Sequence, residues 1–322
     1  GLTFPIPSSA ISRQRCMYCS SVIAAKVSYI VRFRLLLQAM TLKDILANYR
    51  KTLKAIYDEQ EATAVFYLVA EYISGFGRSQ ISFHMNDSIS TENNDHFNLV
   101  LERLKRSEPL QYIFSEAFFY GLKFKVNSSV LIPRPETEEL VEMIIWILKN
   151  TQNTPKILDI GTGSGCIAIS LKRHLPDAEI YGLDISEPAL EIAAENATSN
   201  QTAITFIQSD IRHYVSSNKF DVIVSNPPYI TEEEGLSMDR NVMDFEPHLA
   251  LFVPDQNPLE FYLAIAEFAL ENLHDGGLLF FEINENFGIR TSDMLMNRLL
   301  QDVQFIKDMQ GKDRFISAKK VG

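Results

Sequence analysis

Apolar side chains recur at two different intervals along this chain, and the change of interval divides it into two parts. Between Thr41 and Leu104 they recur every three or four residues, which is the spacing of helices that bury one face. Beyond Pro155, short β-branched runs alternate with helical stretches. The first pattern predicts a small helical domain at residues 40–115. The second predicts an α/β fold in which helices cover both faces of a largely parallel sheet.

The helical part contains three or four predicted helices. The second is expected to begin near Glu59 and to end at Gly75, because glycine commonly follows the last turn of a helix. The apolar side of this helix, which we expect in the core, carries Val65, Leu68, Val69 and Tyr72. The period then shortens at residues 116–135, which predicts a hairpin that links the two domains.

The linker and the α/β part supply the predicted strands. In the linker, residues 118–126 are expected to pair with residues 130–132 across a turn at residues 127–129. The α/β domain is expected to cover residues 136–322, and a turn containing Gly311 near its end predicts an antiparallel edge. The strands of this domain are expected at residues 156–160, 179–183, 205–208, 221–224, 278–283, 304–307 and 314–318.

Composition and charge narrow the classes of function. The chain has 322 residues, of which 46% are hydrophobic and 22% are charged, as in ordinary globular proteins. A net charge of −11 argues against direct binding of nucleic acid, since such proteins usually carry a basic face. Cys16 and Cys19 have CxxC spacing, but Cys166 is the only other cysteine, so we predict no metal site. No stretch is long and apolar enough to predict a membrane span, and we expect a monomer.

Residues 1–39 differ from the rest of the chain. They combine serine, apolar residues and several basic residues, and no acidic residue occurs before Asp44. This composition is typical of an organellar transit peptide, but Met40 also looks like a natural start that upstream sequence precedes. We expect residues 1–39 to lie outside the folded protein. The expected location is cytoplasmic, or mitochondrial if the basic leader is native.

The segment from Asn226 through Pro227 and Pro228 to Tyr229 closes an apolar strand and carries a strong chemical signal. The two prolines must end the strand, because neither has an N–H to give to the sheet. The Asn226 side-chain oxygen and the adjacent carbonyls are then acceptors with no donors beside them, next to the Tyr229 ring. Acceptors that hold both hydrogens of a planar –NH2 group draw its nitrogen toward sp3 geometry, and an aromatic ring stabilises the positive charge that develops. Asn226, Pro227 and Tyr229 are therefore the candidate catalytic residues.

A glycine-rich loop follows the strand predicted at residues 156–160 and leads into a helix. Glycine allows a ligand to approach the backbone closely, and the free N–H groups of a helix N-terminus favour a carboxylate. The glycines are spaced GxGxG, which is tighter than the GxGxxG spacing of dinucleotide-binding folds. The candidate cofactor-binding residues of this loop are Gly161, Thr162, Gly163, Ser164 and Gly165.

Acidic residues follow the next two predicted strands. Asp184 stands where a carboxylate accepts hydrogen bonds from both hydroxyls of a ribose. Asp210 and Ile211 stand where an adenine edge would lie, and Asp210 is a candidate partner of its exocyclic amine. Asn226 completes the candidate cofactor-binding residues, and NAD competes as the cofactor of this set. The tight glycine spacing, Asp159 before the loop and the amine-holding segment at Asn226 favour S-adenosylmethionine.

Several motifs together resemble the protein-(glutamine-N5) methyltransferases that modify peptide chain release factors, and the resemblance runs from about Met40 to the C-terminus. It implies a Rossmann-like class I methyltransferase sheet, a small N-terminal helical domain and S-adenosylmethionine as cofactor. The motifs are LIPRPETE at residues 131–138, GTGSG at residues 161–165, NPPYI at residues 226–230, FEP at residues 245–247 and the turn at residues 311–314.

The resemblance also implies a reaction and a partner. The methyl group would pass to the side-chain amide nitrogen of the glutamine in the Gly-Gly-Gln loop of a class I release factor, which the helical domain, the hairpin and the NPPY segment would hold. Arg134, between two prolines, is either a solvated linker residue or a fixed cation in the cleft. Relatives often have an aromatic residue where this chain has Ile211, and a glycine near Ser115. The candidate substrate-binding residues are Asn226, Pro227, Pro228, Tyr229 and Arg134.

Two other classes of function stay open at this point. An adenine-N6 methyltransferase acting on DNA or RNA needs the same cofactor and the same grip on an –NH2 group, but would be expected to carry a basic groove. A scaffold or sensor would bind S-adenosylmethionine and transfer nothing. Glu282, at the end of a predicted strand near the cleft, is expected to be a solvated strand end.

Overall fold

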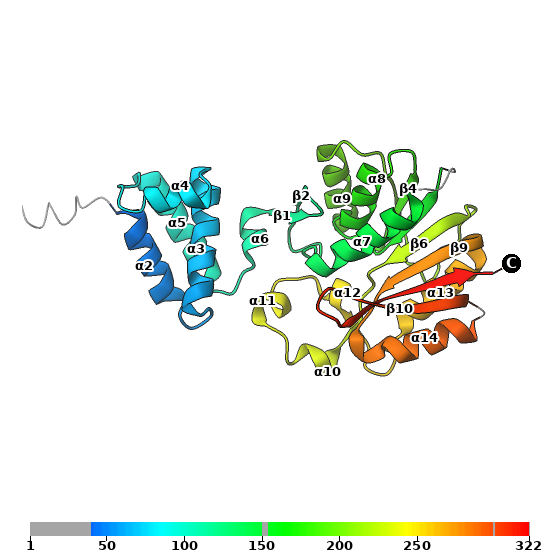
Figure 1. Cartoon of the computed structure of the whole chain (residues 1–322). Helices are drawn as coiled ribbons and strands as arrows, with labels where there is room; N and C mark the ends of the chain where they lie inside the picture. Colours follow the sequence, from blue (N-terminus) through cyan, green and yellow to red (C-terminus); the bar gives the residue numbers. More distant parts are fainter. Residues whose placement is uncertain (1–39, 150–153, 299, 322) are drawn as a thin grey trace, which may run out of the picture. The chain divides into compact units, whose positions relative to one another are not determined.

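The structure is a computed structural model that describes residues 40–149, 154–298 and 300–321. These residues form two compact units that divide after Lys105 (Figure 1). The expectations for the leader at residues 1–39, including the Cys16 and Cys19 pair, lie outside the described residues. In the part of the chain that is described, no helix has the length and apolar character needed to cross a bilayer.

The first unit is built from helices around an aromatic core. The ring of Tyr49 packs edge-on against the rings of Phe66 and Phe97, with centroids 5.9 and 6.2 Å away. The side chain of Asp58 caps one helix, and Gly75 ends it with φ of +70°, as predicted. The helices are α2 (Leu42–Leu53), α3 (Glu59–Ser74), α4 (Arg78–Phe83) and α5 (Thr91–Leu104).

The predicted buried face of α3 was right at Val69 and wrong at Leu68 and Tyr72. Leu68 and Tyr72 are each 50% exposed, whereas Phe66 and Val69 are fully buried. The sequence of α3 is apolar on more than one side, so periodicity alone does not choose the face. Phe66 decides it, because only this orientation lets the largest apolar side chain of the helix join the aromatic core.

The second unit contains a seven-stranded sheet in the order β10-β11-β9-β6-β3-β4-β5. The five strands from β9 to β5 pair in parallel, and β11 pairs antiparallel with both β9 and β10. The predicted antiparallel edge is therefore confirmed. The strands are β3 (Lys156–Ile160), β4 (Glu179–Asp184), β5 (Thr205–Gln208), β6 (Phe220–Ser225), β9 (Leu273–Glu282), β10 (Leu300–Lys307) and β11 (Asp313–Lys320).

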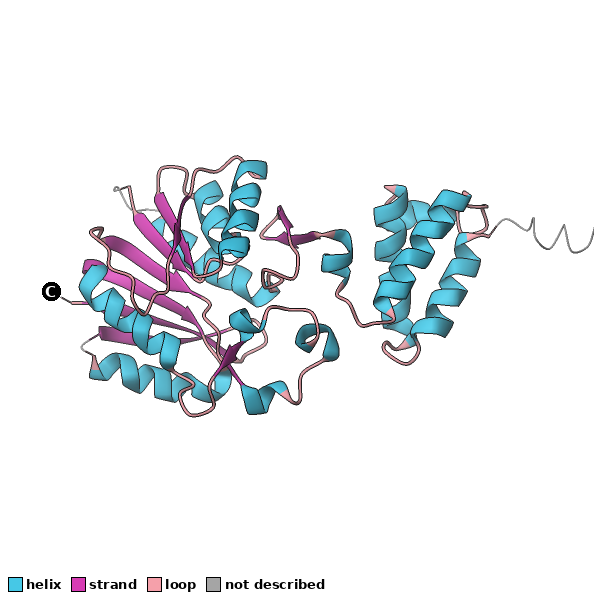
Figure 2. Cartoon of the chain, turned by 180° about the vertical axis from the view of Figure 1, so that it is seen from behind, coloured by secondary structure: helices cyan, strands magenta, loops and turns pink. Residues whose placement is uncertain are grey.

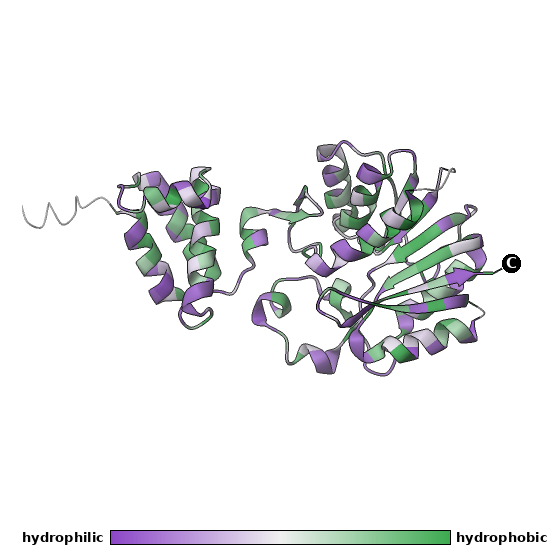
Figure 3. Ribbon diagram, viewed as in Figure 1, coloured by the Kyte–Doolittle hydropathy of each residue, from purple (hydrophilic) through white to green (hydrophobic). Residues whose placement is uncertain are grey.

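Helices cover both faces of this sheet (Figure 2). Ile157 packs into the cluster that contains α7 and α8, and its neighbour Leu158 packs into the cluster that contains α13 and α14. Because alternate residues of each central strand meet opposite helical layers, these strands are mostly hydrophobic and have no polar face (Figure 3). The flanking helices are α7 (Pro135–Leu148), α8 (Cys166–His174), α9 (Glu187–Ser199), α13 (Glu260–Asn272) and α14 (Gly288–Asn297).

A short hairpin precedes α7, but its turn is not where the sequence predicted it. Strand β1 (Glu116–Phe119) pairs with β2 (Leu122–Lys125) across Tyr120 and Gly121, and residues 130–132 form no strand. Both turn residues have positive φ, +49° and +73°. Residues 117–122 form an apolar run that contains one glycine and no polar turn residue, so nothing in the pattern marks this two-residue turn.

Short elements carry the chain between the sheet and its loops. Helix α6 ends at Ser115, which has φ of +57°, near the position where relatives often carry glycine. Strands β7 and β8 form a small parallel pair after the NPPY segment. These elements are α6 (Leu110–Phe114), β7 (Ile230–Thr231), α10 (Glu232–Gly235), α11 (Arg240–Met243), α12 (His248–Leu251), β8 (Phe252–Val253) and the 3-10 helix η1 (Glu285–Phe287).

Candidate active site

Two adjoining pockets lie at the carboxyl ends of the parallel strands, which is where ligands bind in open α/β sheets. The pockets meet at Asn226 and Pro227, which line both together with Leu131 and Ala250. The larger pocket is lined by Gly161, Gly163, Asp184, Asp210, Ile211, Asn226, Pro227 and Pro228, among others. The smaller is lined by Leu131, Arg134, Asn226, Pro227, Tyr229, Ile230, Met238, Ala250 and Leu251.

Residues 161–165, the glycine loop, leave β3 in a conformation that needs glycine. Gly161, Gly163 and Gly165 all have positive φ, between +53° and +79°. A Cβ on Gly165 would lie 2.9 Å from Ile169 Cδ1 and 3.3 Å from Ala193 Cβ, so this glycine allows close packing of the helices. A Cβ on Gly161 would meet no atom within 4 Å, which leaves open space above the loop for a ligand.

The predicted loop residues divide into two groups. Gly161 and Gly163 line the larger pocket, whereas Thr162, Ser164 and Gly165 do not. Thr162 and Ser164 are buried, and the Thr162 hydroxyl donates to Asp159 Oδ2 over 2.7 Å. Burial raises the pKa of Asp159 to about 7. Direct contact of Thr162, Ser164 and Gly165 with a cofactor stays a prediction.

Asp184 is held by the backbone on both sides. Its Oδ2 accepts from the Gly163 N–H over 2.8 Å, and its Oδ1 accepts from the Ser186 N–H over 3.0 Å. Burial raises the pKa of this carboxyl, and the backbone donors oppose that rise. The contacts fix the carboxylate at the pocket wall and leave it further lone pairs for hydroxyl donors.

Asp210 forms an ion pair that the sequence analysis missed. Arg212 Nη2 lies 2.7 Å from Asp210 Oδ2, and Arg212 Nη1 lies 2.5 Å from Glu260 Oε1. Arg212 holds the pKa of Asp210 below its usual range, so this carboxyl is ionised near neutral pH. Ile211, which is buried, lines the pocket beside it. The spacing of Asp210 and Arg212 could have suggested this pair, whereas Glu260 is far away in the sequence.

We call Asn226, Pro227, Pro228 and Tyr229 the acceptor corner. Tyr229 is held at both ends, since its hydroxyl donates to Glu282 Oε1 over 3.1 Å and its carbonyl accepts from Asn284 Nδ2 over 3.1 Å. These contacts hold the Tyr229 ring at the wall of the smaller pocket.

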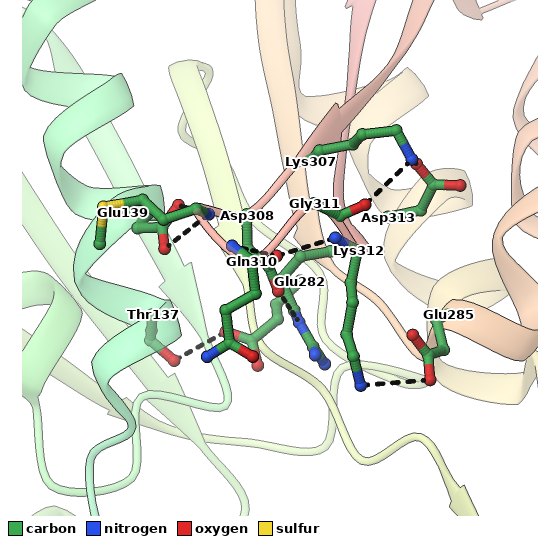
Figure 4. A network of polar contacts seen from close by, with 12 residues as sticks. Thr137, Glu139, Glu282, Glu285, Lys307, Asp308, Gln310, Gly311, Lys312 and Asp313 are labelled. Carbon is green, nitrogen blue, oxygen red and sulfur yellow. Dashed lines mark hydrogen bonds and ion pairs between the residues drawn. The ribbon is translucent and has the colours of Figure 1, made fainter.

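Glu282 is not a solvated strand end. It is 2% exposed, and besides Tyr229 it accepts a hydrogen bond from the Thr137 hydroxyl over 2.7 Å (Figure 4). Thr137 in turn accepts from Asn226 Nδ2 over 3.4 Å. Burial raises the pKa of Glu282, and burial together with the Glu282 charge raises the pKa of Tyr229. A polar residue at the end of a central buried strand was the available signal for this role.

A cation at the start of β11, next to the turn from β10, acts on the charge of Glu282. Asp308 accepts from the backbone N–H groups of Gln310 and Lys312, which folds the turn (Figure 4). Asp308 also accepts from Arg314 Nε over 3.3 Å. The Arg314 charge lowers the pKa of Glu282 and so partly offsets the effect of its burial.

Arg134 is an ion-paired residue of the smaller pocket rather than a solvated linker residue. Its Nη2 lies 2.7 Å from Glu246 Oε1, and its side chain is 33% exposed. Glu246 is buried, and its Oε2 also accepts from the Ile132 N–H over 3.2 Å. Glu246 therefore joins the segment before α7 to the segment that leads into α12, and the first segment and α12 both contribute residues to the pocket. A direct contact of Arg134 with substrate stays a prediction.

Known proteins similar to this chain agree on its family. Residues 44–114 match the family model described as PrmC N-terminal domain, and residues 140–244 match the model described as Methyltransferase small domain. A release factor glutamine methyltransferase of Flavobacterium psychrophilum is 42% identical over 86% of this chain and 98% of its own length. One of Bacteroides thetaiotaomicron, with the same name, is 43% identical over 86% of this chain and 99% of its own length.

A solved structure supports the fold. The catalytic domain of hMettl16, in complex with a 3'UTR hairpin, superposes with a TM-score of 0.50, at 16% identity over 63% of this chain and 76% of that one. At this identity the likeness concerns the fold alone. The second unit is thus a Rossmann-like class I methyltransferase sheet with an antiparallel edge, a fold whose members use S-adenosylmethionine.

Proposed function

Because this chain belongs to the release factor glutamine methyltransferase family, we propose that it transfers a methyl group from S-adenosylmethionine to a release factor. The acceptor is the side-chain amide nitrogen of the glutamine in the Gly-Gly-Gln loop of a class I peptide chain release factor. The observation that carries this proposal is the meeting of two pockets at Asn226 and Pro227. The adenine-N6 alternative is not favoured, since relatives that match over nearly their whole length carry the release factor name.

The larger pocket has the features that the cofactor requires. Open space above Gly161 suits the methionine part, and the nearby helix N-terminus favours its carboxylate. Asp184 would accept from the ribose hydroxyls, and Asp210 would accept from the adenine amine while Ile211 packs on the ring. When bound, S-adenosylmethionine supplies a methyl group on a positively charged sulfur.

The acceptor corner would make the substrate nitrogen reactive. An amide nitrogen is a poor nucleophile because its lone pair is delocalised into the carbonyl group. Asn226 Oδ1 and a neighbouring backbone carbonyl would hold its two hydrogens, which favours a geometry with a localised lone pair. The face of the Tyr229 ring would stabilise the positive charge that reaches the nitrogen during transfer. This mechanism needs no strong base before the methyl group moves: the carbon–sulfur bond breaks as the carbon–nitrogen bond forms, and the methylated nitrogen, now positively charged and strongly acidic, then loses one hydrogen as a proton to water.

Arg134 and the smaller pocket would receive the peptide around the glutamine. The pocket is largely apolar apart from Arg134, Asn226 and backbone groups, which suits a glycine-rich loop. The Arg134 guanidinium, already held by Glu246, would donate to a peptide carbonyl of that loop.

The helical unit would contribute binding of the release factor. Leu68 and Tyr72 lie four residues apart on one side of α3 and are both half-exposed, so together they offer an apolar surface for the factor. Leu68→Asp is expected to raise KM for the release factor about tenfold with kcat retained. An unchanged KM in steady-state methylation would remove this surface from the proposal.

A methyl-transfer assay with purified release factor tests the function. Labelled methyl is expected on a factor with the native Gly-Gly-Gln loop, and on the glutamine side chain when the peptide is mapped by mass spectrometry. A factor whose loop glutamine is replaced by alanine is the matched control and should take no label. Equal labelling of both factors, or transfer to an adenine-containing oligonucleotide instead, would overturn the proposal.

A further inference from the structure

A short chain of hydrogen bonds joins Asn226 to the buried end of β9. Asn226 Nδ2 donates to Thr137 Oγ1, and Thr137 Oγ1 donates to Glu282 Oε2. Thr137 and Glu282 are each 2% exposed. Water therefore does not compete for these groups, and the partners that the protein supplies determine their orientation.

Each hydrogen bond of this series is donated in the direction of Glu282. An ionised carboxylate only accepts hydrogen bonds, so the single hydroxyl proton of Thr137 goes to Glu282. The Thr137 oxygen then has only lone pairs left, and the group that faces it must be a donor. Of the two ends of the Asn226 amide, only the –NH2 end donates.

We propose that Glu282 and Thr137 are positioning residues that fix which end of the Asn226 amide faces the substrate. With its nitrogen held by Thr137, Asn226 presents Oδ1 to the pocket as an acceptor. A reversed amide would present hydrogens to the hydrogens of the substrate –NH2 group. This inference rests on the proposed function, because only an –NH2 substrate requires that orientation.

The same carboxylate also orients the second reactive side chain of the corner. Glu282 accepts from the Tyr229 hydroxyl, and the Tyr262 hydroxyl donates to the Glu282 backbone carbonyl over 3.2 Å. The charged groups that face Glu282 are Glu136 of α7, which raises its pKa, and Arg314 of β11, which lowers it. One buried charge thus holds Asn226, through Thr137, and Tyr229 directly.

Thr137→Val tests this series of hydrogen bonds, because valine keeps the shape of threonine and removes the hydroxyl. We expect kcat for release factor methylation to fall about 10- to 100-fold, the loss typical of one oriented hydrogen bond to a charged network. Cofactor affinity, measured by calorimetry, should change less than about twofold. Thr137→Ser, which restores the hydroxyl, should return kcat to within about threefold of the wild type.

A double-mutant cycle separates positioning from a structural role. In an Asn226→Ala background there is no amide to orient, so adding Thr137→Val should lower single-turnover rates less than about twofold. A purely structural role for Thr137 would give the same 10- to 100-fold loss in both backgrounds, and that result would overturn the proposal. So would a kcat for Thr137→Val alone within twofold of the wild type.

Glu282→Gln provides a readout in pH. The carboxamide of this variant can donate to Thr137 Oγ1, which permits the hydrogen bonds to run in the opposite direction and the Asn226 amide to turn over. We therefore expect kcat to fall at least about tenfold. Glu271→Gln, on the surface of α13, is the matched control. Burial raises the pKa of Glu282, so wild-type kcat should decline as pH falls through that raised value. Glu282→Gln should lack this acid limb, and its persistence would exclude Glu282 as the titrating group. Failure of the wild type to methylate release factor would instead reject the proposed function.

Discussion

The glycine loop and the acceptor corner line adjoining pockets, but they are held in place in different ways. The contacts of the loop stay within one strand–helix–strand–helix stretch: Thr162 bonds to a residue 3 positions away, Gly163 to one 21 positions away, and Ser164 to one 32 positions away. The contacts of the corner bridge 89 positions from Asn226 to Thr137 and 53 positions from Tyr229 to Glu282. The loop is therefore specified by a contiguous stretch of sequence, and the corner by the assembled sheet.

This difference also separates the effects expected from substitutions. Changes in the glycine loop should act on cofactor binding and on folding, because the loop shapes the pocket and packs two helices. Changes in the acceptor corner should act on turnover, because its groups stabilise a geometry that the substrate reaches only during reaction.

Asn226→Ala is expected to have the largest effect on turnover. It removes the acceptor that holds the substrate nitrogen, so kcat should fall about 100- to 1,000-fold, as when one preorganised hydrogen-bonding group is lost from an active site. Cofactor affinity should change little. Gln304→Ala, on the exposed side of β10, is the control and should match the wild type in single-turnover methylation. Near-normal turnover of Asn226→Ala would remove this residue from the mechanism.

Gly165→Ala should damage the other region. The new Cβ would lie 2.9 Å from Ile169 Cδ1 in a residue with φ of +79°, so we expect a loss of about 1–3 kcal/mol in the free energy of unfolding, measured in urea. Cofactor affinity should fall about tenfold, while kcat at saturating cofactor is largely retained.

Gly121→Ala is the matched control for Gly165→Ala. Its φ is +73°, but a Cβ there meets no atom within 4 Å. Gly121→Ala should lower the free energy of unfolding by about 1 kcal/mol, from backbone strain alone, and leave cofactor affinity unchanged. Equal losses in both variants would show that packing against α8 and α9 contributes nothing.

Sequence patterns predicted the structure correctly where neighbouring residues determine it. The bounds of β3 and β5 agree with prediction, because a run of apolar residues between turn residues defines each strand. The positive φ values of the glycine loop follow from its composition. Gly161, Gly163, Asp184 and Asp210 were predicted to lie around one pocket, and their positions at strand ends required only the alternation of strands and helices.

Sequence patterns failed where partners come from distant elements. Glu282 looks like a solvated residue until Thr137 and Tyr229 are known to surround it. The buried face of α3 depends on Phe66 meeting rings from two other helices, which periodicity does not register. The turn at Tyr120 and Gly121 was missed because it lies inside an apolar run without the polar residues that usually mark a turn.

Tyr229 allows the smallest and most discriminating test of the corner. Tyr229→Phe keeps the ring that faces the smaller pocket and removes only the hydroxyl that donates to Glu282. If the ring face stabilises charge on the nitrogen, kcat should fall only about three- to tenfold, whereas Tyr229→Ala should cost at least a further tenfold. Cofactor affinity should be unchanged in both variants. The methylation rates are measured in quenched single-turnover reactions with release factor. Equal losses for Phe and Ala would mean that the ring contributes little and that the Glu282 contact alone orients the corner. Turnover would then depend on the contact between the corner and the distant residue Glu282, and not on stabilisation of charge by the Tyr229 ring.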